Sequence, residues 1–243
     1  NMSGSGALTV TGGGNVTLSG TNTYAGGTTV SAGTLTGTTT SVQGNITNNA
    51  AVVFDQATSG TYAGVMSGTG SLTKTGSGTV ILTNDNSYGG GTTINGGVLQ
   101  LGNGGTSGSI TGNVVVNGAD SLLAFNRSDT VTFAGDISGA GGIMLMGPGT
   151  VKLTGNNTFT GGTAIGGGIV QASSDAAFGA AGTTLRIGGG ATVQALASFI
   201  SDRAVSLLAM GGTFDTGGNT LTLQGPITGA GALTKVGSGT LIL

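Results

Sequence analysis

The sequence predicts an all-β fold, a parallel β-helix or solenoid of about eleven stacked coils. First, the pattern of apolar, glycine and threonine positions in 67–101 recurs three more times along the chain. Second, glycine occupies 54 of 243 positions and proline only 2, without a three-residue period, which excludes collagen and implies frequent tight turns. Third, short aliphatic runs alternate with a period of two, as strands with one buried face do.

Composition excludes several classes of protein. Hydrophobic residues make up 37% and charged residues 6%, whereas disordered chains combine low hydrophobicity with high charge. Six basic residues against eight acidic ones leave a net charge of −2 and no basic patch, so nucleic acid is not expected as a partner. The chain has no cysteine, which removes disulfides and thiolate metal sites and fits an extracellular setting. The apolar runs are too short to span a membrane directly.

The repeat has four copies, at 4–35, 68–99, 139–170 and 229–243. The fourth copy stops within its second strand, so we expect 1–243 to be a single β-helical repeat segment of a larger protein, truncated at both ends. In the second copy the structural repeat positions are Leu72, Lys74, Val80, Leu82, Asn86, Tyr88, Gly90, Gly91, Thr92, Ile94, Gly97 and Leu99.

Each copy is expected to open with two short strands. In the first copy these are 7–10 and 15–18, and alternation sends Val16 and Leu18 to one face and Thr17 to the other. The second copy keeps aliphatic residues at the outer positions of this triplet, and the middle position varies between copies. We therefore predict that Leu82 is interior and that Ile81 points outward.

A polar turn follows the second strand. It contains an asparagine, an aromatic residue and a Gly-Gly-Thr step, represented by Asn86, Tyr88 and 90–92. Asparagine and glycine tolerate positive φ, so these turns are expected to be corners that stack on one another. The spacing of the copies fits three, three and four coils of about 21 to 24 residues.

The segments between the copies must form further coils. Six glycine-bounded runs are expected to be strands: 45–47, 52–54, 114–116, 131–133, 184–187 and 220–223. Two places could depart from strand structure: a helical turn at 173–179, and a short helix or lateral loop at 194–204. An antiparallel barrel or sandwich is the competing all-β fold, but it does not explain the long-range repeat.

Two stretches carry a resemblance to a known family. They are 229–241, with Leu-Thr-Lys before Gly-Ser-Gly-Thr, and 86–99, with Asn-Ser-Tyr-Gly-Gly-Gly-Thr and a closing Gly-Val-Leu. Both resemble the passenger-associated transport repeat of bacterial autotransporters, and 174–179 and 211–218 look like that family's spacers. The resemblance implies a right-handed parallel β-helix in a passenger domain. Such a passenger is exported through the periplasm to the bacterial cell surface, and its partner is its own C-terminal outer-membrane β-barrel.

The sequence departs from the repeat at three positions. Val10 and Leu145 stand where other copies have Lys74 and Lys235, and Pro148 replaces a small polar residue. A lysine at a strand end can lay its stem on the core and hold its ammonium outside, so an aliphatic residue there is tolerable.

Residues for chemistry are scarce. Without histidine or cysteine, Ser-His-Asp and Cys-His sites cannot exist. Two serines lie beside lysines, Ser77 beside Lys74 and Ser238 beside Lys235. Both pairs belong to the repeat itself and are interpreted as surface turns. The only concentration of charge consists of Asp120, Arg127, Asp129 and Asp136, which could serve an acidic sugar or Ca²⁺ but is otherwise a set of solvent-facing charges. We expect no enzyme activity, no catalytic residues, no cofactor and no metal.

The sequence lacks the motifs of two other classes of ligand-binding protein. Calcium-binding nonapeptides need an aspartate that 12–16 lacks. A flat ice-binding face would need Thr-x-Thr on successive coils, and Lys74, Met144 and Met146 break that pattern.

The leading hypothesis is therefore a structural stalk of a surface-exposed or secreted passenger, with a role in adhesion and self-association. A polysaccharide-binding or lyase-type β-helix is the first alternative. An adhesive module that binds a host surface ligand through the side of the solenoid is the second. We also expect the uncapped strand at 237–243 to promote association end to end.

Overall fold

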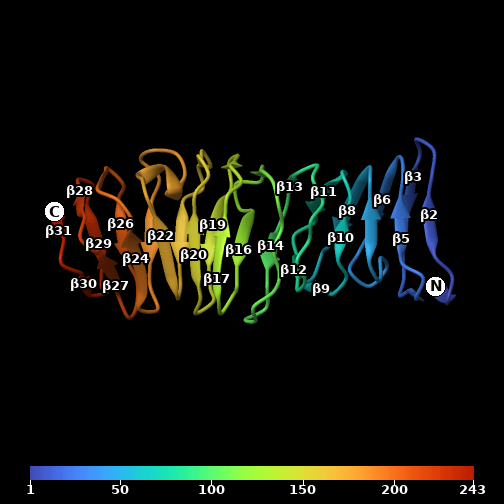
Figure 1. Ribbon diagram of the computed structural model, residues 1–243, viewed down its shortest axis with the longest axis horizontal. Helices are drawn as coiled ribbons and strands as arrows, with labels where there is room; N and C mark the ends of the chain where they lie inside the picture. Colours follow the sequence, from blue (N-terminus) through green and yellow to red (C-terminus); the bar gives the residue numbers. More distant parts are fainter. The chain divides into compact units, whose positions relative to one another are not determined.

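The computed structural model describes residues 1–243, which form two compact units. Unit 1 comprises 1–103 and 107–123, and unit 2 comprises 104–106 and 124–243. Each unit is a stack of short parallel strands with almost no helix (Figure 1). Together the units hold about twelve turns, so the predicted all-β solenoid is confirmed and its coil number is close to the prediction.

Unit 1 holds three series of parallel strands, ordered β10-β7-β5-β2, β15-β13-β11-β8-β6-β3 and β14-β12-β9, and the pair β1-β4. The strands are β1 (Ser3–Gly4), β2 (Leu8–Val10), β3 (Asn15–Thr17), β4 (Thr23–Tyr24), β5 (Thr28–Val30), β6 (Thr34–Gly37), β7 (Ile46–Asn48), β8 (Ala51–Asp55), β9 (Gly60–Tyr62), β10 (Met66–Ser67), β11 (Ser71–Thr75), β12 (Thr79–Leu82), β13 (Thr92–Ile94), β14 (Val98–Leu101) and β15 (Val114–Val116).

Unit 2 is built in the same way, with the series β29-β26-β23-β21-β19, β17-β20-β22-β24-β27-β30 and β25-β28-β31. Its strands are β17 (Thr130–Phe133), β18 (Ile137–Ser138), β19 (Gly142–Leu145), β20 (Thr150–Leu153), β21 (Thr163–Ile165), β22 (Ile169–Ala172), β23 (Leu185–Ile187), β24 (Ala191–Ala195), β25 (Phe199–Ser201), β26 (Val205–Leu207), β27 (Gly212–Asp215), β28 (Thr220–Leu223), β29 (Ile227–Gly229), β30 (Leu233–Val236) and β31 (Thr240–Ile242). The remaining strand, β16 (Leu122–Phe125), contains residues of both units.

The core of each unit is a set of side-chain ladders between paired strands. Leu82 pairs with Tyr62 in the preceding coil and with Leu101 in the following one, and each of the three is at most 2% exposed. Ile81 is partly exposed beside them. Because successive side chains of a strand point to opposite faces, the predicted inward and outward assignment is confirmed.

The copies of the repeat do not lie on the same side of their unit. Leu8 pairs with Thr28, Thr28 with Ile46 and Ile46 with Met66, so three coils end one strand before Leu72. Copy one therefore opens on the β2 series and copy two on the β3 series. In unit 2, copy three likewise opens on β19 and copy four on β30, which belongs to the following series.

The prediction that each spacing between copies holds a whole number of coils is therefore wrong. The prediction that the corners of the copies stack on one another is wrong for the same reason. Paired residues of β2, β5, β7 and β10 are 20, 18 and 20 positions apart, fewer than the expected 21 to 24, whereas in unit 2 the steps from Thr163 to Leu185 and from Val205 to Ile227 are 22. Each spacing between copies within a unit consequently contains about a third of an additional coil.

The paired glycines of the motif are required for two different reasons. A Cβ on Gly90 would lie 2.5 Å from the Gly70 carbonyl carbon of the preceding coil, so that position has no room for a side chain. Gly91 has a φ of +80°, a conformation that glycine adopts without strain. The repeated asparagines do not share this conformation, because Met210 is the only residue other than glycine with positive φ. That part of the corner prediction is wrong.

The remaining element predictions are mostly correct. All six runs between the copies contain strands, and a 3-10 helix covers Asp175–Phe178 within the predicted helical turn. The predicted helix or lateral loop at 194–204 is wrong, because the stretch has no helix, β24 and β25 occupy five of its eleven residues, and Phe199 pairs with Leu221 in the stack. No helix of the chain is long and apolar enough to cross a membrane.

The core assignment can be tested with a pair of adjacent substitutions. Leu82→Asp should destabilise the fold by about 3 kcal/mol or more, because it buries an unpaired carboxylate and leaves a void. Ile81→Asp should cost less than about 1 kcal/mol, because the new carboxylate reaches water. Urea denaturation measures both, and equal midpoints would contradict the assignment.

Candidate functional site

The repeat motif gathers polar side chains inside the wall of the solenoid. In the second copy Asn86, Tyr88 and Thr92 are 2%, 0% and 3% exposed. Asn86 and Tyr88 lie between β12 and β13, and Thr92 is the first residue of β13. Buried polar groups need hydrogen-bond partners, so their contacts show what the motif does.

Asn86 connects three consecutive coils. Its Oδ1 accepts a hydrogen bond from the Met66 backbone N–H at 2.8 Å in the preceding coil. Its Nδ2 donates to the Ser109 carbonyl oxygen at 3.1 Å in the following coil and to Asn84 O at 2.6 Å in its own. The side chain thus satisfies backbone groups at a corner where the strand ladder is interrupted.

The asparagines of the other two complete copies repeat this bridge. Asn22 Oδ1 accepts from Met2 N at 2.7 Å, and its Nδ2 donates to Ser41 O at 2.7 Å. Asn157 Oδ1 accepts from Ile137 N at 2.9 Å, and its Nδ2 donates to Ala177 O at 3.1 Å. The recurrence of asparagine therefore reflects a bridge along the axis.

The aromatic residue and the threonine of the motif form a pair. Tyr88 Oη lies 2.7 Å from Thr92 Oγ1, and Tyr24 and Thr28 have the same distance in the first copy. In the third copy phenylalanine replaces tyrosine, and Thr163 Oγ1 instead donates to Phe178 O at 3.2 Å. The hydroxyl of the threonine is thus paired with a tyrosine in the first two copies and with a backbone carbonyl in the third.

Lys74 differs from its prediction. Its side chain is 0% exposed, and its ammonium donates to the carbonyl oxygens of Thr75 at 2.6 Å, Gly76 at 2.8 Å and Gly96 at 3.1 Å. The expected outward ammonium is therefore wrong for this copy, because three carbonyls at the corner replace water. Burial lowers the pKa of Lys74, while the charge of Asp55 opposes that shift.

Lys235 binds its corner in a related way. Its ammonium donates to Gly237 O at 2.9 Å, to Thr216 Oγ1 at 3.1 Å and to Val236 O at 3.3 Å. Where Val10 and Leu145 replace lysine, the side chain is buried and carries no donor. Lys74 thus joins carbonyls of two coils, whereas Lys235 joins two carbonyls of its own coil to a threonine hydroxyl of the preceding coil.

Arg203 is a buried anchor that sequence reasoning missed. It is 1% exposed and makes a bidentate contact with Asp175, with Nε to Oδ1 at 2.8 Å and Nη2 to Oδ2 at 3.0 Å. Further N–H groups donate to Gly179 O at 2.7 Å and Ala180 O at 2.8 Å. The guanidinium thereby holds the segment with the 3-10 helix against the stack. The sequence signal that could have indicated this role is the presence of an arginine in a chain with so few charged residues.

The charge concentration singled out in the sequence forms no open site. Arg127 Nη2 lies 2.8 Å from Asp129 Oδ2, and it also donates to Thr106 O at 2.6 Å. The hydrogen bond from Arg127 lowers the pKa of the Asp129 carboxyl. Asp136 Oδ1 accepts from the Asn156 backbone N–H, and Asp120 belongs to the other unit. Nowhere does the chain bring together three histidine, cysteine, aspartate or glutamate side chains that could hold a metal.

In both serine and lysine pairs, the two side chains form hydrogen bonds with other groups and not with each other. Ser77 Oγ donates to Ala57 O at 3.4 Å and Ser238 Oγ to Gly217 O at 3.1 Å. Both lysines instead bind carbonyl oxygens at their corners. Neither serine is therefore hydrogen-bonded to the base that an activated nucleophile requires.

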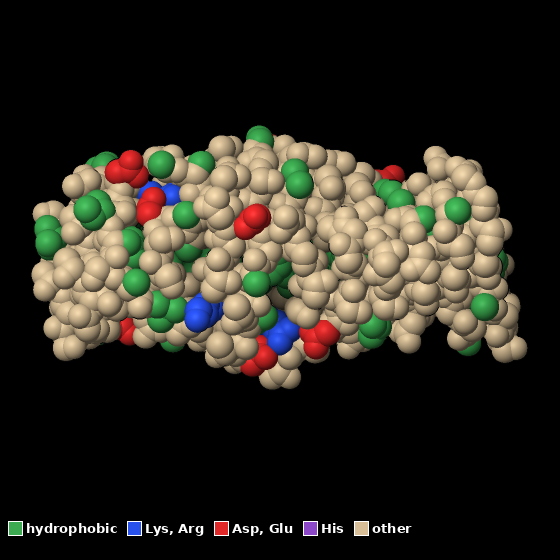
Figure 2. Space-filling model, turned by 45° about the horizontal axis from the view of Figure 1, so that its top comes forward, with side chains coloured by type: hydrophobic (Ala, Val, Ile, Leu, Met, Phe, Trp, Pro, Cys, Tyr) green, Lys and Arg blue, Asp and Glu red, His purple; other side chains and the backbone are tan.

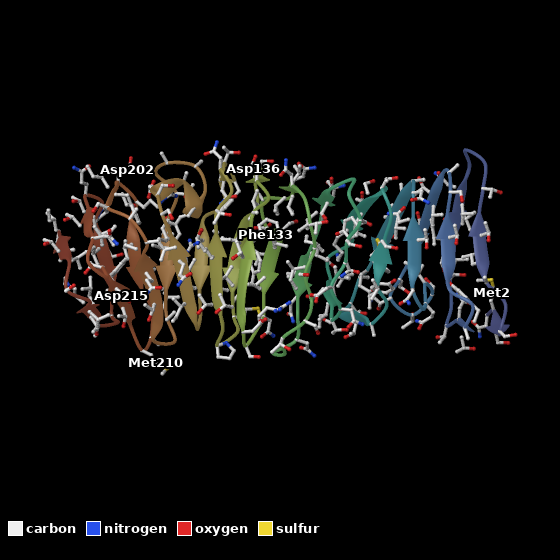
Figure 3. The ribbon with its side chains drawn as sticks, viewed as in Figure 1. Met2, Phe133, Asp136, Asp202, Met210 and Asp215 are labelled. Carbon is white, nitrogen blue, oxygen red and sulfur yellow. The ribbon has the colours of Figure 1, made fainter.

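The surface is largely uncharged. Figure 2 shows basic and acidic side chains in a few small, separate groups among uncharged atoms. Within unit 2, Asp136, Asp202 and Asp215 lie well apart, and Met210 projects from its corner (Figure 3). A hollow of about 230 Å³ lies in unit 1 beside Tyr62, with Thr39, Gln43 and Asn45 at its lining.

The asparagine bridge predicts that removal of one side-chain amide lowers the stability of the fold substantially. Asn86→Ala should destabilise the fold by about 2 to 3 kcal/mol, because the Met66 N–H and the Ser109 carbonyl lose a buried partner. Asn84→Ala is the matched control, since its Nδ2 makes one exposed hydrogen bond to Ala63 O, and should cost less than about 1 kcal/mol. Thermal unfolding compares the two, and similar losses would argue against the bridge.

The buried tyrosines predict a loss of stability in alkali. Burial raises the pKa of Tyr62 and of Tyr88 above the ordinary value of about 10. Above that pH the unfolded chain releases protons that the fold retains, so stability should fall by about 1.4 kcal/mol per pH unit for each phenol. Tyr88→Phe should reduce the slope of unfolding free energy against pH, and an unchanged slope would contradict this assignment.

Comparison with known proteins agrees with the motif. The Passenger-associated-transport-repeat family matches residues 8–36, 72–101 and 146–172, which cover the Asn, Tyr or Phe, and Gly-Gly-Thr corners described above. The match also covers the lysine position of the second copy. No solved structure is significantly similar to the chain.

A curated relative is the protein named Adhesin BmaC autotransporter from Brucella suis biovar 1 (strain 1330). It is 33% identical over 164 residues, which cover 55% of this chain and 5% of that protein. The chain therefore spans only a small part of the length of this relative. The three matches show that the chain carries passenger-associated transport repeats, and together with this similarity and the parallel solenoid they support its resemblance to an autotransporter passenger domain.

Proposed function

We propose that this segment is a structural stalk of a surface-exposed or secreted passenger and contributes to adhesion. The observation that carries the proposal is the continuous parallel pairing of coils within each unit, combined with similarity to a protein named as an adhesin. Every coil presents its neighbours with the same backbone hydrogen bonds, so the stack extends without a separate core for each coil. Such an element is suited to separating an attached region from its base.

The proposed setting follows from the family. The passenger would be exported through the periplasm and would pass through the outer-membrane β-barrel of its own full-length chain. The bacterial surface or the extracellular medium would be its final location.

The adhesive-side alternative keeps the same setting but assigns binding to the wall itself. In unit 1 an outward column runs through Thr17, Thr36, Val53, Thr73 and Thr93, which pair in consecutive strands. Apart from Val53, this column offers hydroxyl groups at the regular spacing of strands, about 4.8 Å. Either a host surface ligand or a second copy of the chain could bind there.

The stalk role can be tested on cells that display the full-length protein. One variant lacks this segment, and another keeps it but carries Thr17→Asn, Thr36→Asn, Thr73→Asn and Thr93→Asn. A stalk predicts that adhesion falls in the deletion and persists in the second variant. Loss of adhesion in both would favour the adhesive wall, and full adhesion of the deletion would overturn both roles.

The polysaccharide alternative has its own measurement. A bound acidic oligosaccharide at a hundred times its dissociation constant should stabilise the fold by about 2.7 kcal/mol. A thermal-shift series with Ca²⁺ and acidic oligosaccharides, with a search for cleavage products, therefore separates this alternative from the stalk. The stalk predicts neither a shift nor a product.

A further inference from the structure

We propose that Asn95 is a site of spontaneous deamidation, promoted by the side chain of Asn117 in the next coil. Three asparagines of the chain precede glycine: Asn95, Asn103 and Asn117. Glycine leaves the following amide nitrogen sterically free to approach the side chain. All three asparagines are exposed, so exposure alone does not distinguish them.

The backbone N–H of the following glycine does distinguish Asn95 from Asn103. The Gly104 N–H donates to the Asn126 carbonyl oxygen at 2.8 Å, so the nitrogen after Asn103 is held in a hydrogen bond. The Gly96 N–H makes no such backbone hydrogen bond. The nitrogen after Asn95 is therefore available to attack without first breaking a contact.

Asn117 supplies the second requirement. Its Nδ2 donates to Asn95 Oδ1 at 2.9 Å. Attack on the side-chain amide places negative charge on Oδ1, and a donor already aimed at that oxygen stabilises the charge as it develops. The alignment of neighbouring coils, in which Ile94 pairs with Val116, places the two asparagines one above the other.

The reaction balances with water as the only co-reactant. The Gly96 nitrogen forms a bond to Asn95 Cγ and gives up its proton, which is transferred to Nδ2, and the bond from Cγ to Nδ2 breaks to release ammonia. Water then opens the resulting succinimide to a carboxylate. Hydrolysis at the side-chain carbonyl gives aspartate, and hydrolysis at the main-chain carbonyl gives isoaspartate.

The surroundings favour the aspartate product. Asn117 Nδ2 would donate to a carboxylate, which makes a stronger hydrogen bond than an amide oxygen does. Isoaspartate would lengthen the main chain between Ile94 and Val98, which both belong to paired strands.

Peptide mapping by mass spectrometry during incubation of the folded protein in mildly alkaline buffer tests this proposal. Asn95 should deamidate faster than Asn103. Asn117→Ala should slow the reaction at Asn95 by about threefold to tenfold, the loss expected for one hydrogen bond. Asn103 in the same sample is the internal control.

The control separates the proposed promotion from general loosening of the fold. If Asn117→Ala merely loosened the corner, the reaction at Asn95 would become faster. Either an increase at Asn95 or an unchanged rate would overturn the role of Asn117. Equal rates at Asn95 and Asn103 in the unaltered protein would overturn the site itself.

Discussion

The parallel hydrogen-bonded register between coils is the constraint on which the structure of each unit depends. It aligns each interior residue with one in the coil before and one in the coil after, as Leu82 is aligned with Tyr62 and Leu101. A shift by one residue would turn every core side chain outward. The sequence must therefore fix the register at many independent points.

Polar side chains supply such points, both inside and outside the wall. The asparagine bridges bind backbone groups of two neighbouring coils, and the lysines bind carbonyls where strands end. On the outside of unit 2, Gln171 Nε2 donates to Gln194 Oε1 at 2.6 Å, and Gln194 Nε2 donates to Asp215 Oδ2 at 2.7 Å. A slipped register would leave these groups without partners, which is costly when they are buried.

The sequence predicted the strands and the core, because the alternation of apolar and polar residues and the glycines at strand ends are local properties that determine each strand. It did not predict the roles of Asn86 and Lys74, since the Asn86 bridge to Met66 and the Lys74 bond to Gly96 join groups about 20 residues apart that only the coil length brings into contact. The same limit applies to Arg203, whose partner Asp175 lies in a different coil. Errors in coil length also explain why the corners were wrongly expected to stack.

The rotation of the copies has a consequence for function. Because copy two of unit 1 opens one strand series after copy one, their equivalent outward residues face different directions. A repeat selected to present one recognition surface would be expected to return to the same side. The preserved positions, such as Asn86 and Gly90, are instead those that solve the local problem of turning a corner and bonding to the next coil. The repetition of these positions therefore serves the building of coils and not the presentation of one recognition surface.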